Sequence, residues 1–169
     1  LTLGNGVTYL GEWAFASQKF TGSLIVPDGV TELFLNTFAD CTGFTGTLTI
    51  GSAVTTIGVG AFAPLHYPLS LRNKLMEFTG VVVLPPTVTS IGERAFRSCE
   101  KLTVVIQPDS SGQLPTMGDD ACENTKACIT LPATQGGTYQ GGLSFQVVAA
   151  TTYEDFSGAA FSTFKAQLA

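Results

Sequence analysis

The residues that could carry out chemistry are few in this chain. His66 is the single histidine, and it has no cysteine or carboxylate at the spacing of metal ligands. Asp119, Asp120 and Glu123 are acidic, but their spacing fits no calcium loop, so we expect a solvated turn there. The sequence also lacks a Ser/His/Asp set, a phosphate loop and paired carboxylates in a recognisable cleft. It therefore predicts no enzyme activity, no cofactor and no metal site.

Glu93 and Arg94 lie in the stretch VTSIGERAFRSC at residues 88–99, beside a glycine and a cysteine. The apolar letters of this stretch recur in VTTIGVGAF at 54–62 and in VTYLGEWAF at 7–15, but the polar letters change. Catalysis would need the polar residues to be kept, whereas packing needs the apolar ones. We therefore interpret the stretch as one unit of a repeat.

Each repeat unit combines a short strand, a turn and a second apolar segment. The units open at Phe20, Phe44, Phe78 and Leu102. Two alternating apolar residues follow each opener, which is the pattern of a half-buried strand. A further column holds Phe15, Phe38, Phe62 and Phe96, with Cys122 in the fifth unit. One unit cannot bury such a face alone, so the pattern predicts stacked units with a ladder of phenylalanines as their spine.

The pattern L-x-x-I-x-I-P-x-x-V-x-x-I-G-x-x-A-F-x-x-C, seen here as FTGVVVLPPTVTSIGERAFRSC at 78–99, resembles the BspA-type leucine-rich repeat family. The resemblance covers about residues 1–132. It implies a right-handed solenoid on extracellular surface proteins, used for adhesion or protein binding, and it carries no catalytic residues. The departures from the pattern are an insertion at 64–73, Cys122 in place of a phenylalanine, and a fifth unit lengthened at 110–113.

The C-terminal tail, residues 133–169, does not follow the repeat. Alternating apolar residues near 143–147 suggest a last strand, and Thr151 and Glu154 form a capping box that opens an amphipathic helix over 151–168. We expect this helix to cap the last unit, although a partner-binding helix is the alternative interpretation. The predicted fold is thus a leucine-rich repeat solenoid of about six to seven stacked strands with a C-terminal capping helix.

The four cysteines permit disulfides without requiring them. Cys41 and Cys99 hold the same place two units apart, roughly 10 Å from each other, which is too far for a disulfide, so we expect buried thiols. Cys122 and Cys128 are close in the sequence, and two interpretations stay open. The pair could form a local disulfide, or Cys122 could simply replace a phenylalanine of the spine.

Two groups of residues are candidates for contact with a partner. The outward strand residues are Thr2, Ile25, Thr49, Val83, Val105 and Thr130. They are β-branched, short and half apolar, which suits contact with a protein. The insertion contributes His66, Tyr67, Arg72 and Lys74. Insertions of this kind often belong to the binding surface of a solenoid, and neutral decoration is the alternative.

Composition and charge narrow the choice of partner. The net charge is −5 and no run of Lys or Arg occurs, which disfavours nucleic acid and anionic membranes. The apolar runs are far shorter than the roughly 18 residues of a membrane span. We expect an extracellular or cell-surface module that binds a protein or extracellular matrix. The alternative is a structural subunit of a surface appendage or filament, packing end to end with its own copies, because Leu1 opens directly on a strand with a bare edge.

Overall fold

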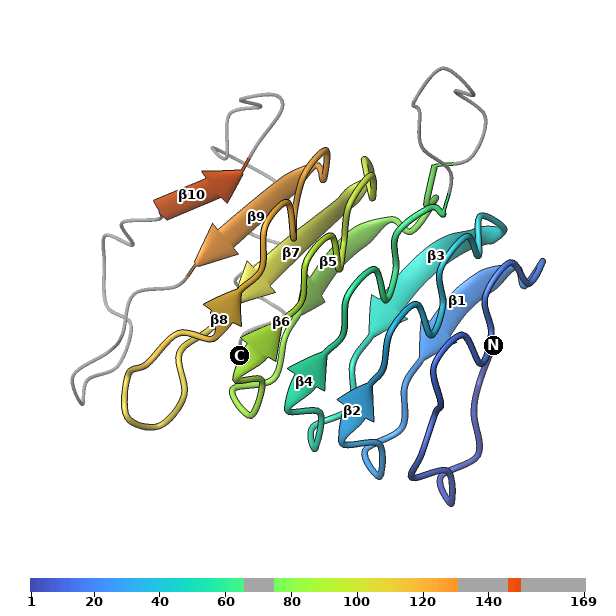
Figure 1. Cartoon of the computed structure of the whole chain (residues 1–169), viewed down its shortest axis with the longest axis horizontal. Helices are drawn as coiled ribbons and strands as arrows, with labels where there is room; N and C mark the ends of the chain where they lie inside the picture. Colours follow the sequence, from blue (N-terminus) through green and yellow to red (C-terminus); the bar gives the residue numbers. More distant parts are fainter. Residues whose placement is uncertain (66–74, 131–145, 150–169) are drawn as a thin grey trace.

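The structure is a computed structural model, and it describes residues 1–65, 75–130 and 146–149. Over these residues the chain coils into a stack of similar units (Figure 1). Each unit contributes a longer strand to one side of the stack and a two-residue strand to the other. No helix occurs within the described ranges. The predicted repeat solenoid is therefore confirmed.

Two series of strands form the two sides of the stack. The longer strands are β1 (Gly22–Ile25), β3 (Phe44–Thr49), β5 (Gly80–Val83), β7 (Leu102–Ile106) and β9 (Ala127–Thr130). The short strands are β2 (Glu32–Leu33), β4 (Thr56–Ile57), β6 (Ser90–Ile91) and β8 (Thr116–Met117). Strands that pair within these two series run parallel, because a full turn of the coil separates each strand from the next.

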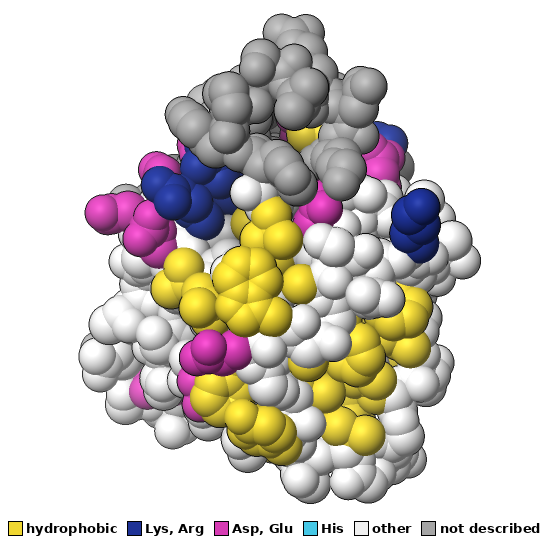
Figure 2. All heavy atoms as spheres, turned by 45° about the vertical axis from the view of Figure 1, so that its right-hand side comes forward, with side chains coloured by type: hydrophobic (Ala, Val, Ile, Leu, Met, Phe, Trp, Pro, Cys, Tyr) yellow, Lys and Arg dark blue, Asp and Glu magenta, His cyan; other side chains and the backbone are white. Residues whose placement is uncertain are grey.

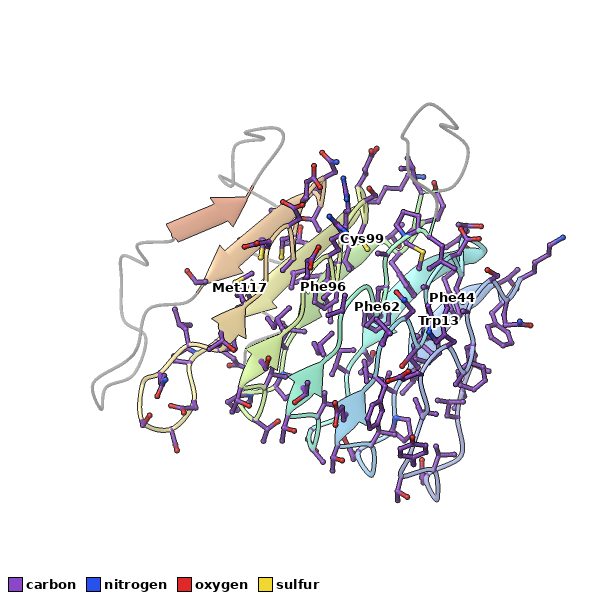
Figure 3. The ribbon with its side chains drawn as sticks, viewed as in Figure 1. Trp13, Phe44, Phe62, Phe96, Cys99 and Met117 are labelled. Carbon is purple, nitrogen blue, oxygen red and sulfur yellow. The ribbon has the colours of Figure 1, made fainter. Side chains whose placement is uncertain are left out.

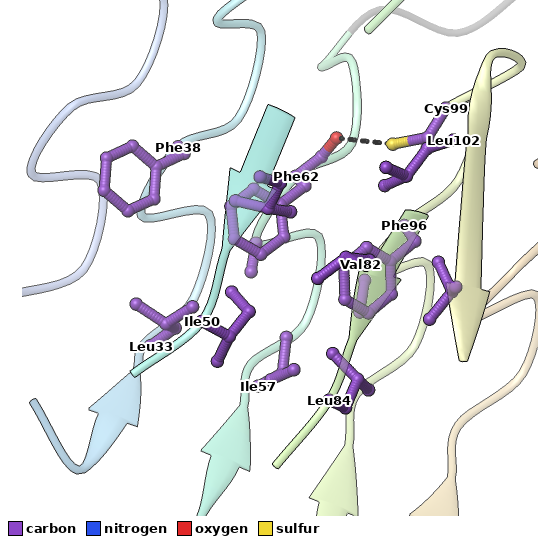
Figure 4. Close-up of a cluster of buried hydrophobic side chains, with 14 of the residues drawn as sticks. Leu33, Phe38, Ile50, Ile57, Phe62, Val82, Leu84, Phe96, Cys99 and Leu102 are labelled. Atoms are coloured by element: carbon purple, nitrogen blue, oxygen red, sulfur yellow. Dashed lines mark hydrogen bonds between the residues drawn. The ribbon is translucent and has the colours of Figure 1, made fainter. Parts of the chain in front are cut away.

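The core lies between the two series of strands. Leu24 pairs with Leu48, and Val82 pairs with Val104, so the inward residues of successive units lie in rows. All four side chains are buried. The short strands contribute the buried side chains of Leu33, Ile57 and Ile91 from the opposite side. Figure 4 shows the first two of them. The alternation read from the sequence thus places the core correctly in these units.

A column of phenylalanine rings runs through the centre of the stack, as the sequence predicts. The ring centroids of Phe38 and Phe62 are 5.8 Å apart, and those of Phe62 and Phe96 are 5.4 Å apart. All three rings are fully buried between the two series of strands (Figures 3 and 4). The backbone N–H of Phe62 donates to the carbonyl of Ala95 at 2.8 Å, and this bond holds the two units in register.

Close approach of successive turns explains the glycine of the repeated Ile-Gly pair. A Cβ added to Gly92 would lie 2.5 Å from the backbone nitrogen of Val59. One added to Gly118 would lie 2.3 Å from the backbone nitrogen of Glu93. These distances leave no room for a side chain. The glycine column is therefore a requirement of stacking.

Glu93 and Arg94 lie on the outside of their turn, about half exposed. Arg94 pairs with Glu93 at 3.0 Å and with Asp120 of the next unit at 3.8 Å. In the same way Glu123 pairs with Arg97 at 2.7 Å. The pairs Arg94–Asp120 and Arg97–Glu123 join neighbouring turns, and the first is exposed whereas the Arg97 side chain is largely buried. The interpretation of this stretch as a repeat unit is confirmed.

The sheet changes direction after β9. The strand β10 (Gln146–Ala149) pairs with β9 in the antiparallel sense, whereas the other paired strands of the described residues are parallel. The sequence predicts a last strand near 143–147, and β10 confirms that a strand exists there but lies slightly later. The helix predicted over 151–168 lies outside the described residues and stays a prediction.

Candidate functional site

One part of the outer face of the longer strands is open to solvent. Thr2 forms a bridge with Ile25, and Ile25 pairs with Thr49, so these three predicted contact residues lie in one row across the sheet. Ile25 is 44% exposed, and Thr2 and Thr49 are exposed as well. Val83, on β5, is half-buried. The outward row is accessible over β1 and β3 and becomes partly covered at β5.

Val105 is fully buried, and the prediction that it faces the open side is wrong. It lies opposite Val83, as expected, but every residue of β7 is buried, so neither face of this strand meets water. The strand reads LTVVI, with one polar letter. Such a nearly continuous apolar run is typical of a strand covered on both faces. This run is the signal that separates β7 from the half-exposed strands.

Thr130 lies in the inward row, so its predicted outward orientation is also wrong. In the pairing of β9 with β7, Cys128 is opposite Val104 and Thr130 is opposite Ile106, and both partners are core residues. Ile129 therefore takes the outward position. The predicted alignment of this unit is off by one residue. A shift of one residue in a strand moves every side chain to the opposite face.

The open face carries hydroxyl and apolar groups and no charged side chain. The strands read GSLI in β1, FTGTLT in β3 and GVVV in β5. The backbone N–H and the hydroxyl of Thr47 both donate to the hydroxyl oxygen of Ser23, at 3.1 and 3.2 Å. Outward polar groups of adjacent units are thus linked to each other. Such a surface can pack against a protein and form hydrogen bonds with it, but it offers no acid or base.

The second group of predicted contact residues, His66, Tyr67, Arg72 and Lys74, lies outside the described residues. The flanks of the insertion are described, and they lie close together. The rings of Phe62 and Phe78 meet edge to face with centroids 6.0 Å apart. Across the same junction, the N–H of Thr79 donates to the carbonyl of Gly46 at 3.0 Å. The stack is continuous through this point, and the role of the loop stays a prediction.

Cys41 and Cys99 occupy equivalent places in their units. The thiol of Cys41 donates to the carbonyl of Phe15 at 2.9 Å, and the thiol of Cys99 donates to the carbonyl of Phe62 at 3.7 Å (Figure 4). Both are buried free thiols. Burial raises the pKa of each thiol above its ordinary value, so both stay protonated at neutral pH. The prediction of buried structural thiols is confirmed.

Cys122 and Cys128 are neighbours in the last parallel unit. The N–H of Phe96 donates to the carbonyl of Ala121, which places Cys122 in the spine position. A hydrogen bond with the thiol of Cys128, together with burial, raises the pKa of Cys122 well above its ordinary value. Both are free thiols in the structure. Cys122 therefore replaces a spine phenylalanine, and a disulfide between these two neighbours stays a prediction.

Sequence reasoning missed a group of exposed aromatic side chains on the first two units. Tyr9 is 68% exposed and Trp13 is 48% exposed. The ring of Tyr9 packs against that of Phe34 with centroids 5.2 Å apart. The repeat alignment could have revealed them, because Tyr9 occupies the same repeat position as Glu32, and Trp13 the same position as Asn36. Aromatic residues in outward columns therefore mark a surface that packing inside the chain does not explain.

Residues 1–65, 75–130 and 146–149 contain neither a metal-binding cluster nor a membrane-spanning helix. Within these ranges no three His, Cys, Asp or Glu side chains lie together in a way that could hold a metal ion. The same part of the chain has no helix with the length and hydrophobicity of a membrane span.

Comparison with known proteins agrees with this architecture. The BspA type leucine rich repeat region matches the chain in six copies, over residues 1–69 and 74–159. Neither the curated proteins nor the solved structures provide a match. The matched residues include every strand of the structure. The chain therefore belongs to the BspA-type leucine-rich repeat family.

Proposed function

We propose that this chain is a non-catalytic module that binds another protein through the outer face of β1, β3 and β5. The observation that carries the proposal is that the solvent exposure of the outer face changes along the stack. Outward side chains are exposed on β1 and β3, whereas β7 and β9 are buried on both faces. Extended sheet surfaces of this kind are what solenoid proteins use for binding.

We further propose that the partner is a protein of another cell surface or of the extracellular matrix. Members of the BspA-type family are typically extracellular or surface-associated, and leucine-rich repeats generally mediate contacts between proteins. The uncharged face also fits a protein better than a polyanion, because a polyanion would be attracted by Lys and Arg.

The size of the open face limits the strength of the contact. Strands about 4.8 Å apart, each with about four residues at roughly 3.3 Å per residue, give about 200 Å² over three strands. A specific interface usually buries about 800 Å² on each partner. The face alone therefore supports a weak contact, and tight binding needs a second surface or several copies.

A panel of immobilised matrix glycoproteins and polysaccharides tests the proposal. The purified chain is expected to give saturable binding to at least one protein and to none of the polysaccharides, measured by surface plasmon resonance. Binding to polysaccharides alone would contradict a protein-binding role.

A second candidate function is a structural subunit that packs end to end with its own copies. The first unit has partly buried hydrophobic residues that a further unit, of this chain or of another copy, would cover, and they are Leu1, Leu3, Val7, Phe15 and Phe20. The antiparallel strand β10 weighs against it, since β10 occupies the edge of β9 to which a parallel strand of another copy would add. Sedimentation over a range of concentrations separates the two. Concentration-dependent polymers favour the subunit, and a constant monomer favours the binding module.

A further inference from the structure

We propose that Tyr9, Trp13 and Phe34, together with the carboxylates of Glu12 and Glu32, form a second docking surface that takes a basic segment of a partner protein. This surface is called the aromatic–acidic patch below. It shares no residue with the open face of β1, β3 and β5. Arginine or lysine side chains of the partner would lie against the rings and pair with the carboxylates.

The first argument is exposure. Tyr9 and Trp13 are 68% and 48% exposed, and Phe34, which supports the ring of Tyr9, is half-buried. Figure 2 looks at the side of the molecule that bears the N-terminal units, and hydrophobic and acidic side chains alternate on it. Tyr and Trp are the residues that most often dominate the binding energy of protein interfaces. Exposed aromatic rings of this size are therefore candidates for partner contact.

The second argument is the backbone of Trp13, labelled near the N-terminal end of the stack in Figure 3. Its φ is 58°, in the left-handed region. Other units place Asn36, Gly60, Arg94 and Asp120 at this position with positive φ. Arg94 forms ion pairs with Glu93 and Asp120 there, and Asn, Gly and Asp adopt that conformation readily. Tryptophan does not, and its half-exposed ring gains little packing inside the chain in return. Contact with a partner explains why a strained position holds an exposed tryptophan.

The third argument is that the patch faces outward from the side of the stack. Arg94 stands in the column of Trp13 and has units on both sides, yet 49% of its side chain is exposed. Val59 stands in the column of Glu12, also between two units, and is 44% exposed. Exposure varies along the two columns, and Gly60, in the column of Trp13, is buried. Arg94 and Val59 nevertheless show that a side chain in these columns can stay open to solvent with a unit on each side.

The fourth argument is charge. Glu12 adjoins Trp13 in the chain. Glu32 lies beside Tyr9, because the next residues along the chain, Leu33 and Leu10, form a β-bridge that aligns the two units. In the part of the chain that the structure describes, neither carboxylate takes part in an ion pair. Lys19 is the one basic residue within residues 1–65. The patch is thus acidic without a cation of its own.

Arginine and lysine side chains match both features of the patch. A cation is attracted to the face of a Trp or Tyr ring within about 6 Å, and it pairs with a carboxylate beside that ring. A guanidinium group is planar, so it can stack on a ring and hydrogen-bond to a carboxylate at once. A neutral sugar would use the rings but would leave both carboxylates without a cation. The charges therefore favour a basic protein segment over a glycan.

The test uses the fluorescence of Trp13, the single tryptophan of the chain. The probes are a short peptide of alternating arginine and serine, the matched peptide with glutamate in place of arginine, and a neutral oligosaccharide. The arginine peptide is expected to change the emission of Trp13 saturably, and added salt should weaken the effect. The other two probes should cause no change.

Variants separate the patch from the general negative charge of the protein. The double variant Glu12→Gln/Glu32→Gln is expected to lower the affinity for the arginine peptide about tenfold, and calorimetry of Tyr9→Ala should show a similar loss. The matched control, Glu93→Gln/Asp119→Asn, removes the same two charges from outward positions without exposed aromatic rings, and should stay within about twofold of the wild type. Thermal melts establish that each variant is folded.

Three results would overturn the proposal. The first is an equal loss of affinity in both double variants, which would mean that only net charge matters. The second is a saturable signal with the oligosaccharide but not with the arginine peptide, which would make the patch a glycan site. The third is the absence of any saturable signal with the arginine peptide at low salt.

Discussion

The rings of Phe62 and Phe96, from successive units, stack with centroids 5.4 Å apart and planes 15° from parallel. The same relationship joins Phe38 to Phe62, and Phe15 to Phe38. Each inner ring therefore supports two others. In a stack whose units contact only their neighbours, stability is the sum of such contacts, so the spine holds the open face in place.

Removing one ring of the spine should destabilise the protein strongly. Phe96→Ala is expected to lower the free energy of unfolding by about 3–5 kcal/mol, because the cavity lies between rigid neighbours. Glu93→Ala should change it by less than about 0.5 kcal/mol, since its ion pair with Arg94 is exposed. Denaturant unfolding curves measure both. A larger loss in Glu93→Ala than in Phe96→Ala would contradict the role of the spine.

A methyl group at the glycine column should also destabilise the stack. Gly92→Ala would place a Cβ 2.5 Å from the backbone of Val59, and overpacking of this kind costs about 1–3 kcal/mol. Gly6→Ala is the matched control, because a Cβ there meets nothing within 4 Å. Melting temperatures of the two variants give the comparison. Equal temperatures would show that the units do not approach as closely as described.

Alkaline pH should destabilise the protein through its buried thiols. Burial raises the folded-state pKa of Cys99, so the folded state keeps the thiol proton that the unfolded state loses above about pH 8.5. The contribution of the thiol is thus fully present below about pH 8.5 and is lost as pH rises, by about 1.4 kcal/mol per pH unit. Unfolding curves between about pH 8 and 10 should show this decline. A Cys99→Ala variant should decline less steeply, and an identical slope would contradict the assignment.

The insertion at 64–73 should be dispensable for folding. Phe62 and Phe78 are in contact across it, so a shorter connection would join units that already stack. Loop closure depends weakly on length, and a variant in which these residues are trimmed to a short turn should unfold cooperatively with a similar midpoint. Loss of the cooperative transition would show that the insertion belongs to the core. Loss of partner binding with folding kept would make it a binding site.

The solenoid, its Phe spine and the inward rows of the first four units could be predicted from the sequence, because apolar columns at a fixed spacing have one packing solution. The register of β9 could not. The fifth unit is lengthened at 110–113, and Cys128 replaces the aliphatic residue that would mark the inward position. Alignment of the residue types with the other units then assigned Ile129, one residue away, to the inward position. Pairing with Val104 of β7 decides the register, and this information is tertiary.

The accessible part of the candidate face was also only partly predictable. Alternation correctly identified Ile25 and Thr49 as outward, but it could not show that the same row is closed at Val105. Burial of both faces depends on which other parts of the chain cover a strand. The antiparallel direction of β10 could not be predicted either, because the residue pattern of one strand does not determine whether it pairs in the parallel or the antiparallel sense.

The affinity of two threonine variants for a protein ligand tests the central claim most directly. Thr49→Glu places a charge on the open face of β3, whereas Thr56→Glu places the same charge on the outward side of β4, in the other series of strands. Surface plasmon resonance with a protein that binds the wild-type chain should show a loss of about tenfold or more for Thr49→Glu and a change within about twofold for Thr56→Glu. Unchanged affinity in Thr49→Glu, or a larger loss in Thr56→Glu, would contradict binding through the outer face of β1, β3 and β5.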